Sequence, residues 1–379
     1  IRRPPRSTQG VSSAASDVYK RQILVLKEDI FGALDEGKGK FGGKGNFVVK
    51  KIPFPKIFDG AAVVDIKSTG ICGSDLHMTY DRTEAEVIPG GHEVAGEIVE
   101  LPKEYRGNLN LGDRVAIDCI GAGKSCNSCY YCLYGQFRHC INRHEETGGA
   151  FSSFITRSPN GLFKISDDMD YTDGALVEPV AVSVHGFRFA KFTPGDSVAI
   201  IGSATIGLSA ICVAKSYGAG KIIASAKYEH QAEAAKKMGA DIVVSSEEGE
   251  LEEVCMQETD GIGIDVAVET IGGRSNLPLS QAAKCVKKTG KVIVLGGFRI
   301  PIEVDFLQPM VKEISFIPAT CYANIDGRHD FELAIDILSN GKHPYKSIVT
   351  HKVSLENIQK GFETAYDKKT RSIKVHIMQ

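Results

Sequence analysis

The strongest constraint on the fold is a regular alternation of strand and helix patterns in the second half of the chain. Ser197–Ile201 is a mainly apolar run that predicts a buried strand, and a helical pattern follows it as far as Tyr217. The alternation continues through predicted strands at 221–225, 241–244, 264–268 and 291–295, with helical patterns such as 231–238 between them. Because parallel strands joined by helices form right-handed βαβ units, this half predicts a doubly wound parallel sheet.

A glycine-containing turn joins the first of these strands to its helix. The turn reads Gly202-Ser203-Ala204-Thr205-Ile206-Gly207, a GxAxxG pattern after a strand and before a helix, which is the context required for dinucleotide binding. Helix N-termini offer N–H donors and a positive dipole to a pyrophosphate. We therefore predict a cofactor site at Gly202, Ala204, Ile206 and Gly207, in which the Ala204 methyl group replaces the usual middle glycine. The alternative is an ordinary strand-to-helix turn.

The residues after the second strand bear on the choice of cofactor. A carboxylate at this place binds the ribose hydroxyls of NAD, whereas a cation without a carboxylate suits NADP. Here Ala226 and Lys227 come before the first acid, Glu229. The pattern favours NADP slightly, with Lys227 on the 2′-phosphate. The alternative is that Lys227 is a solvated charge and that Glu229 or the backbone binds NAD.

The first half of the chain is patterned for short strands. We expect strands at 23–27, 61–68 and 94–100, a turn followed by a strand over 111–117, and a flexible surface loop over Phe31–Phe47. Gly96, inside one of these strands, suits a close approach of the backbone. This half therefore predicts a β-rich, barrel-like domain.

A group of potential metal ligands follows the strand at 61–68. Cys72 lies in Gly70–His77, His92 comes 20 positions later, and a distant candidate ligand is Glu178. A catalytic zinc takes three protein ligands and leaves one position open. Ligands from separate segments suit a cleft, so we predict a catalytic zinc here. Taken singly, Cys72 could instead be a core thiol and His92 a loop histidine.

Four further cysteines lie close together in sequence. Cys126, Cys129, Cys132 and Cys140 can surround one tetrahedral zinc, which would be structural because four thiolates leave no open position. An iron–sulfur cluster is the alternative from thiolates alone. Disulfides are disfavoured because the chain reads as a protein of a reducing compartment.

Composition excludes several classes of function. The net charge is −2 and the pI is about 6.6, which offers no electrostatic basis for binding nucleic acid or an anionic membrane. No apolar run approaches the roughly 20 residues needed to span a bilayer. Residues 1–22 have no secretory pattern and resemble translated adapter sequence, so we expect a disordered, non-native extension; the alternative for this Arg- and Ser-rich start is a transit peptide. We expect a cytoplasmic protein.

From about Ile23 onward, these motifs resemble the medium-chain, zinc-dependent alcohol dehydrogenase superfamily, in that family's order. The resemblance implies a GroES-like catalytic domain at 23–178, a Rossmann domain at 179–321, and a C-terminal segment at 322–379 that returns to the catalytic domain. Thr350–Val353 and the helix after it look like the returning segment. Homodimers or homotetramers are expected by resemblance.

The resemblance also implies roles for individual residues. Glu178 takes the third-ligand position, as in the sorbitol, butanediol and threonine dehydrogenase branch, and Glu93 is a carboxylate that can approach the metal. Asp75 would orient the His92 ring. The remaining matches are Ser74 and His77 at the proton-relay positions and Lys374 where a cation often meets the cofactor pyrophosphate. The glycine-rich stretch at 37–45 and Ala204 depart from the family pattern.

These residues predict a dehydrogenase. Zinc acts as a Lewis acid that acidifies a bound hydroxyl group, so a hydride can pass from a secondary alcohol or polyol to NAD(P), giving the ketone, while Ser74 and His77 carry the proton away. The alternatives are a zinc-ribbon-type binding module, a non-catalytic cofactor-binding protein, and a zinc-free quinone reductase. Two zinc ions per chain are expected for the dehydrogenase, one for the ribbon and none for the reductase.

Overall fold

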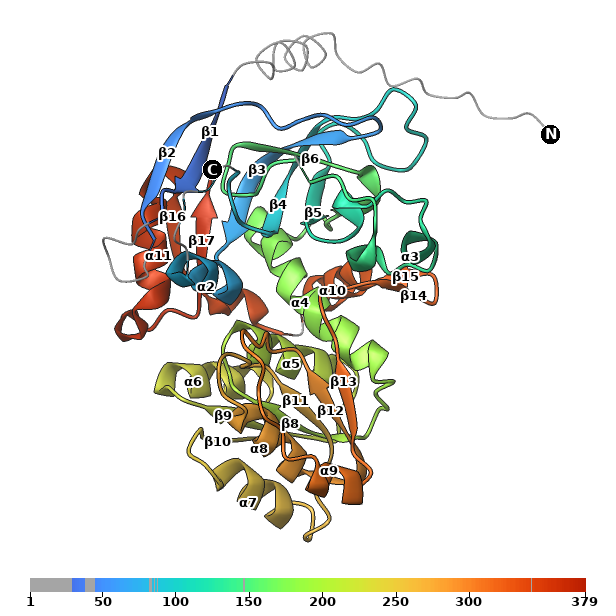
Figure 1. Ribbon diagram of the computed structural model, residues 1–379, viewed down its shortest axis with the longest axis vertical. Helices are drawn as coiled ribbons and strands as arrows, with labels where there is room; N and C mark the ends of the chain where they lie inside the picture. Colours follow the sequence, from blue (N-terminus) through green and yellow to red (C-terminus); the bar gives the residue numbers. More distant parts are fainter. Residues whose placement is uncertain are drawn as a thin grey trace, which may run out of the picture.

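The computed structural model describes residues 29–37, 45–81, 84, 86, 88–145, 147–341 and 343–379. Two bodies follow one another along the long axis: a β-rich body and a body of strands alternating with helices (Figure 1). The expectations for residues 1–22 and for the strand at 23–27 lie outside the described residues.

The β-rich body contains a seven-stranded sheet in the order β16-β17-β3-β4-β5-β7, with β6 paired to β3. Its strands are β3 (Ala62–Gly70), β4 (Glu93–Glu100), β5 (Arg114–Asp118), β6 (Phe154–Arg157), β7 (Leu162–Lys164), β16 (Val349–Ser354) and β17 (Lys374–Met378). The strands predicted at 61–68 and 94–100 and the turn and strand predicted over 111–117 are confirmed. A Cβ on Gly96 would lie 2.2 Å from the Asp65 carbonyl oxygen, so the predicted close backbone approach is also confirmed.

The second body is a six-stranded parallel sheet in the order β10-β9-β8-β11-β12-β13. The strands are β8 (Ser197–Ile201), β9 (Lys221–Ala226), β10 (Ile242–Ser245), β11 (Ile264–Glu269), β12 (Val286–Val294) and β13 (Ser315–Pro318). The helices are α5 (Thr205–Ser216), α6 (Glu229–Met238), α7 (Glu250–Gln257), α8 (Leu277–Cys285) and α9 (Leu307–Val311). This strand order is that of a Rossmann sheet, so the predicted fold class is confirmed.

Helix α4 (Tyr171–Phe189) connects the two bodies and packs with α5, β4 and α10 (Asp330–Ser339). It begins at Tyr171 because Asp170 and Asp173 form a capping box that satisfies free N–H groups at the helix start. The apolar residues of α4 join those of α5 and β8 in the largest hydrophobic cluster. The positions of side chains on α4 are therefore fixed relative to both bodies.

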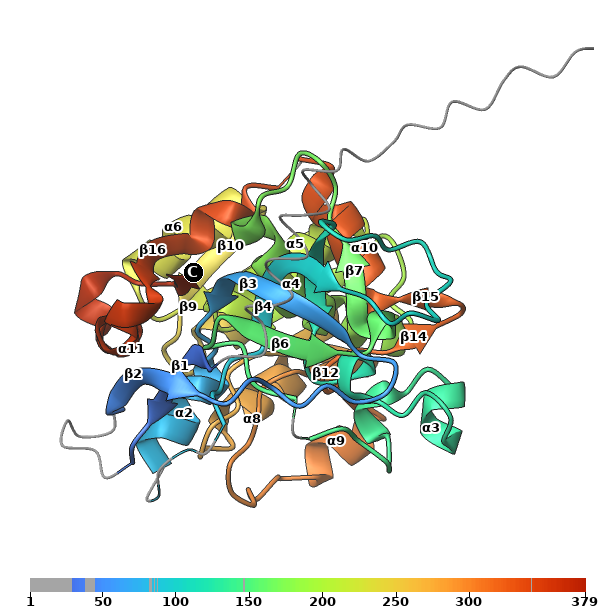
Figure 2. The same cartoon turned by 90° about the horizontal axis from the view of Figure 1, so that it is seen from above.

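The segment after the Rossmann strands crosses back to the β-rich sheet. Strand β17 pairs antiparallel with β3, and β16 pairs parallel with β17. Thr350–Val353, the segment that resembled a returning one, lies in β16, and helix α11 (Ile358–Tyr366) follows it. Seen from the front and from above, α11 lies at one side of the β-rich body and α3 (Tyr130–Leu133) at the other (Figures 1 and 2).

One prediction in the first half is wrong. Phe31–Phe47 is not a loop throughout, because β1 (Ile30–Asp35) and β2 (Phe47–Ile52) form an antiparallel pair in which Asp35 is opposite Phe47. Glycines and charges suggested a loop. The side chains of β1 are mostly buried and show little alternation of buried and exposed positions, so the sequence had no clear strand pattern there. Residues 38–44 lie outside the described part.

The remaining elements are short. They are α2 (Gly73–Asp81), the strands β14 (Asn324–Ile325) and β15 (Arg328–His329), and 3₁₀ turns at 122–124, 137–139, 159–161, 345–348, 355–357 and 368–370. Within the described ranges, no helix has the length and apolar character needed to cross a membrane.

Candidate metal centre and cofactor site

Strand pairing brings one thiol, one imidazole and one carboxylate together. Cys72 follows β3, while His92 and Glu93 stand at the start of β4, and the register pairs Gly70 with Glu93. One ligand atom from each of Cys72, His92 and Glu93 lies within 4.8 Å of the others. A Cβ on Gly70 would lie 2.1 Å from a Glu93 carboxylate oxygen, so only glycine leaves room for that side chain.

Asp75 holds two members of this group in place. It lies in the first turn of α2, is buried, and accepts a hydrogen bond of 2.9 Å from the Cys72 backbone N–H. Its other oxygen lies 3.6 Å from Nδ1 of His92. A carboxylate at Nδ1 leaves Nε2 available as a ligand, which is the arrangement of orienting carboxylates around metal sites. The structure therefore places Asp75 where the resemblance implied.

The Lys374 side chain is buried against Glu93 and is not at the surface. Its ammonium group is buried and donates to both Glu93 carboxylate oxygens at 2.7 and 2.6 Å, and to the Ile71 carbonyl oxygen at 3.0 Å. The resemblance implied a contact with the cofactor pyrophosphate. In the structure the charge of Lys374 is instead directed at the Glu93 carboxylate, because two buried opposite charges pair when water is excluded.

Glu178 lies on α4 and is also buried. It is not among the three residues within 4.8 Å of one another. Burial raises its pKa to about 8; His92 opposes the rise and Glu93 adds to it. Burial lowers the pKa of His92, but the charges of Asp75, Cys72 and Glu178 outweigh it, so the pKa lies well above its ordinary value.

The charges of the side chains around His92 show whether this site suits a divalent cation. Around His92 lie the half-buried Cys72 thiol and the buried carboxyl groups of Asp75, Glu93 and Glu178, and the buried Lys374 ammonium group is the balancing cation. A zinc ion prefers sulfur, imidazole and carboxylate ligands, and its charge would offset the excess of acidic groups. The donor set therefore fits a zinc ion, which Cys72 and His92 would hold together with Glu93 or Glu178.

The second group of ligands is the four-cysteine lobe. The sulfur atoms of Cys126, Cys129, Cys132 and Cys140 all lie within 4.8 Å of one another, and two of the separations are 3.5 Å. Four sulfur atoms at about 2.3 Å from one zinc are about 3.8 Å apart, whereas a disulfide needs about 2.05 Å. The lobe therefore fits a tetrahedral metal ion.

The relay residues lie on the exposed side of α2. Ser74 and His77 are three positions apart on this helix, and both are exposed. Residues three apart share a helix face, so the structure places them on one surface close in sequence to Cys72.

The glycine turn has the geometry that phosphate binding requires. Gly202 has a φ of +93°, and a Cβ on Gly207 would lie 1.9 Å from the Gly202 carbonyl oxygen. Ala204 is the N-cap of α5 and makes no side-chain hydrogen bond to the helix. The first N–H groups of α5, including that of Ile206, therefore have no capping side chain at Ala204 to compete with a ligand. Lys227 is exposed just after β9, and its ammonium group lies 5.7 Å from the Tyr228 ring centre.

The metal ligands and the glycine turn lie close together. The Thr205 hydroxyl, in the first turn of α5, lies 3.4 Å from the carbonyl oxygen of Ile373, the neighbour of Lys374. The Tyr345 hydroxyl donates to the Thr205 carbonyl oxygen at 3.1 Å. Sequence reasoning missed Tyr345, because nothing in a lone tyrosine after a proline marks it as a partner of a helix 140 positions away.

Comparison with known proteins agrees with this arrangement. Residues 59–167 match the alcohol dehydrogenase GroES-like domain, and residues 205–340 match the zinc-binding dehydrogenase domain. Sorbitol dehydrogenase of Bacillus subtilis is 32% identical over 341 residues, which cover 87% of this chain and 93% of that protein. L-idonate 5-dehydrogenase of Vitis vinifera is 32% identical over 317 residues, covering 80% of this chain and 84% of that one.

Among solved structures, an Escherichia coli oxidoreductase of unknown specificity superposes with a TM-score of 0.80 at 27% identity, covering 92% of this chain and 99% of that chain. A Rossmann sheet joined to a GroES-like domain that gathers zinc ligands defines a zinc-dependent dehydrogenase. The chain belongs to the medium-chain, zinc-dependent alcohol dehydrogenase superfamily. It is an oxidoreductase that uses zinc and NAD(P) to transfer a hydride between a secondary alcohol or polyol and the nicotinamide.

Proposed function

We propose that the chain oxidises a polyol at a secondary hydroxyl group, with Cys72, His92 and Glu178 as the ligands of a catalytic zinc. The observation that carries the proposal is the group of Cys72, His92 and Glu93 within 4.8 Å, next to the N-terminus of α5. The relatives with 32% identity include a sorbitol dehydrogenase and an L-idonate 5-dehydrogenase, which supports a polyol or sugar-derived substrate.

Zinc bound at this place supplies Lewis acidity, which lowers the pKa of a coordinated hydroxyl group. The protein contributes orientation: Asp75 fixes the His92 ring and the Cys72 backbone. Lys374 keeps the Glu93 carboxylate paired, which leaves Glu178 as the carboxylate free to bind the metal. We assign Ser74 and His77 to proton release, because both are exposed on α2 beside Cys72 and can pass a proton to water.

A second zinc is proposed for the cysteine lobe, so that each chain holds two. The sulfur separations of 3.5 Å support it. We further propose that NADP is preferred, because the exposed Lys227 follows β9 and no carboxylate lies between the end of β9 and Glu229. The proposed domains are a catalytic domain at 23–178, a Rossmann domain at 179–321 and a returning segment at 322–379, in a homodimer or homotetramer.

The test uses purified, zinc-loaded protein with sorbitol, L-arabinitol and 2,3-butanediol, each with NAD and with NADP, followed by nicotinamide absorbance. We expect oxidation of at least one polyol, two zinc ions per chain by elemental analysis, and near-complete loss of turnover in Cys72→Ser with an unchanged circular dichroism spectrum. Full activity of Cys72→Ser would contradict the zinc assignment. A strong preference for NAD would remove Lys227 from the cofactor site.

A further inference from the structure

A second corner of the chain lies beside the glycine turn at the carboxyl edge of the parallel sheet. It consists of Glu269–Gly272, at and after the end of β11, and is called the β11 corner below. Strands β8 and β11 are neighbours although β9 and β10 come between them in sequence, and Ile201 is paired with Glu269. Ligands of open α/β sheets bind where the strand order reverses in this way. The β11 corner therefore lies at the place where a dinucleotide would bind.

The β11 corner packs directly against the glycine turn. A Cβ on Gly202 would lie 2.7 Å from Cγ1 of Ile271 and 3.3 Å from the Thr270 hydroxyl oxygen. A Cβ on Gly207 would lie 3.2 Å from the same hydroxyl oxygen. Both glycines of the turn therefore approach Thr270, which is half-buried.

Thr270 binds the backbone of the turn through two groups. Its hydroxyl donates to the Ile201 carbonyl oxygen at 2.7 Å and, at 3.3 Å, to the Gly202 carbonyl oxygen. Its backbone N–H also donates to the Ile201 carbonyl oxygen, at 3.3 Å. Because these are the two carbonyl groups where β8 passes into the turn, the hydroxyl group fixes the direction in which both of them point.

The strand on the other side of β8 holds the same turn. The Gly202 N–H donates to the Ser225 hydroxyl oxygen at 3.0 Å, and the Ser203 hydroxyl donates to the Ser225 carbonyl oxygen at 2.8 Å. Ser225 lies on β9. The peptide group that joins Ile201 to Gly202 thus has its C=O held by the β11 corner and its N–H held by β9. It cannot rotate without losing hydrogen bonds on both sides.

Glu269 fixes the shape of the β11 corner. Its side chain is fully buried, and one carboxylate oxygen accepts from the N–H groups of Ile271 and Gly272, both at 2.7 Å. Its carbonyl oxygen accepts from the two N–H groups that follow β12, at 2.9 and 3.1 Å. Thr270 is therefore placed between two residues that are themselves held by hydrogen bonds.

The direction of the two carbonyl groups matters because the cofactor phosphates are anions. In a trans peptide the C=O and N–H groups point in opposite directions. With the Gly202 carbonyl directed at Thr270, the Ser203 N–H points away from Thr270. A rotation of this peptide would put a carbonyl oxygen in the place of an N–H donor, and a carbonyl oxygen repels a phosphate whereas an N–H group binds it.

We propose that Thr270 is a positioning residue of the cofactor site. Its hydroxyl keeps the carbonyl oxygens of Ile201 and Gly202 turned away from the pyrophosphate, so that the N–H groups of the turn and of α5 face the pyrophosphate. This inference rests on the cofactor site proposed at the glycine turn. It applies to NAD and NADP alike, because both carry the same pyrophosphate.

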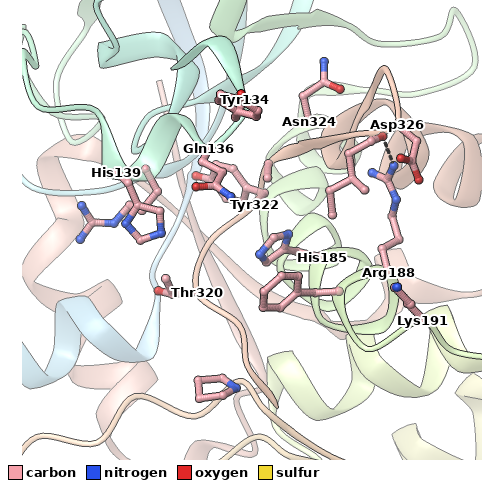
Figure 3. A pocket seen from close by; sticks show the side chains of 15 residues that line it. Tyr134, Gln136, His139, His185, Arg188, Lys191, Thr320, Tyr322, Asn324 and Asp326 are labelled. Atoms are coloured by element: carbon pink, nitrogen blue, oxygen red, sulfur yellow. Dashed lines mark hydrogen bonds between the residues drawn. The ribbon is translucent and has the colours of Figure 1, made fainter. Parts of the chain in front are cut away.

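Cationic side chains also gather elsewhere, around a cavity of about 520 Å³ between the cysteine lobe, the C-terminal half of α4 and the segment after β13. Arg138, Arg188 and Lys191 are among the residues that line it. Figure 3 shows Tyr322 between His139 on one side and Arg188 and Lys191 on the other. No lining residue belongs to the glycine turn or to the β11 corner. Lys191→Gln therefore tests whether this cavity binds the pyrophosphate instead of the turn.

The experiment measures the Kd of NADH, NADPH and ADP-ribose for the zinc-loaded protein, by nicotinamide fluorescence for the first two and by calorimetry for the third. Thr270→Val keeps the shape of the side chain but loses the hydroxyl group. All three Kd values should therefore rise by about 3- to 10-fold, the effect of losing one neutral hydrogen bond. Thr270→Ser keeps the hydroxyl group and should bind within about 2-fold of the wild type. Thr270→Ala also loses the hydroxyl group and takes the place of Thr270→Val if that variant does not fold.

Thr259→Val is the matched control. Thr259 is half-buried in the same body, and its hydroxyl donates to the Cys255 carbonyl oxygen at 2.7 Å, but it precedes β11, whereas the β11 corner follows that strand. This variant should have a lower Tm and keep the wild-type Kd values. Lys191→Gln should keep them as well.

Wild-type affinity in a folded Thr270→Val or Thr270→Ala protein would overturn the proposal, and so would equal losses of affinity in Thr270→Val and Thr270→Ser. A loss in Thr259→Val as large as that in Thr270→Val would also overturn it, because the affinity would then follow the stability of the body and not the direction of the carbonyl groups.

Gly207→Ala separates this proposal from the cofactor site on which it rests, because the added methyl group would obstruct the turn itself. Weaker binding in Gly207→Ala together with wild-type binding in Thr270→Val would leave the site standing and refute the role of Thr270. Wild-type affinity in both variants, or a loss of affinity in Lys191→Gln, would refute the site and the role of Thr270 together.

Discussion

Replacing Gly207 by alanine tests the cofactor site most directly. The added methyl group would lie 1.9 Å from the Gly202 carbonyl oxygen and 2.8 Å from its carbon atom. Ordinary carbon contacts are about 3.5 Å, so the start of α5 must move away from the end of β8 by roughly 1.5 Å. Both clashing atoms belong to the backbone, so no side-chain rotation can relieve the contact.

A shift of this size breaks hydrogen bonds from the α5 N–H groups to the cofactor phosphates, which need donor–acceptor distances of about 2.9 Å. One such bond to a charged group contributes about 1.5–3 kcal/mol, so the Kd for NADH or NADPH should rise by about 10- to 100-fold. The assay is a titration of nicotinamide fluorescence, which tryptophan does not disturb because the chain has none.

Lys215→Ala, an exposed change on the same helix, is the control and should keep the wild-type Kd. Circular dichroism should show that both variants are folded. A folded Gly207→Ala protein with wild-type affinity for both cofactors would refute the assignment of this turn to phosphate binding.

Three further predictions concern stability and metal binding. Burial holds the pKa of His376 at about 3, below its ordinary 6.5, so the unfolded chain takes up the proton first as the pH falls. The free energy of unfolding should therefore decrease by about 2 kcal/mol from pH 7 to pH 5. In urea titrations, His376→Gln should make the free energy of unfolding depend less on pH. Cys129→Ser should reduce the zinc content from two ions to one per chain by elemental analysis, and a retained second zinc would exclude a zinc site at the lobe. Asp75→Asn keeps a hydrogen-bond acceptor for the Cys72 N–H group but loses the charge beside His92. Zinc affinity, measured by competition with a chelator, should therefore fall by about 10- to 100-fold. Unchanged affinity would show that the carboxylate does not orient the His92 ring.

The parallel sheet could be predicted from the sequence because each of its strands is a local apolar run with a helical pattern beside it. Ser197–Ile201 was predicted with the bounds that the structure has. β12 begins at Val286, before its predicted start at 291, because Val286 pairs with Ile264 ahead of a register shift and the residues between 286 and 291 are polar. Local patterns therefore identify buried strands more reliably than they locate the first and last residues of those strands.

The metal ligands could be proposed from the types and spacing of the residues, and the resemblance implied Asp75 beside His92, but the pairing of Lys374 with Glu93 could not be predicted. Lys374 and Glu93 are 281 positions apart, and nothing local to either residue indicates the pair. The pairing depends on β17 lying beside β3, which is a property of the whole topology. For the same reason, no pattern in the sequence indicated that Tyr322 and Arg138 would line one cavity.

The position of Lys374 on β17 has a consequence for biosynthesis. The ribosome makes Glu93 early and the residue that neutralises it only after the whole dinucleotide-binding sheet. Domains generally fold as units during synthesis, so the middle of the chain can fold while the β-rich sheet still lacks β17. Until that strand arrives, the Glu93 carboxylate cannot be buried without a large electrostatic cost, and the nascent sheet should stay open to solvent and to incoming metal ions.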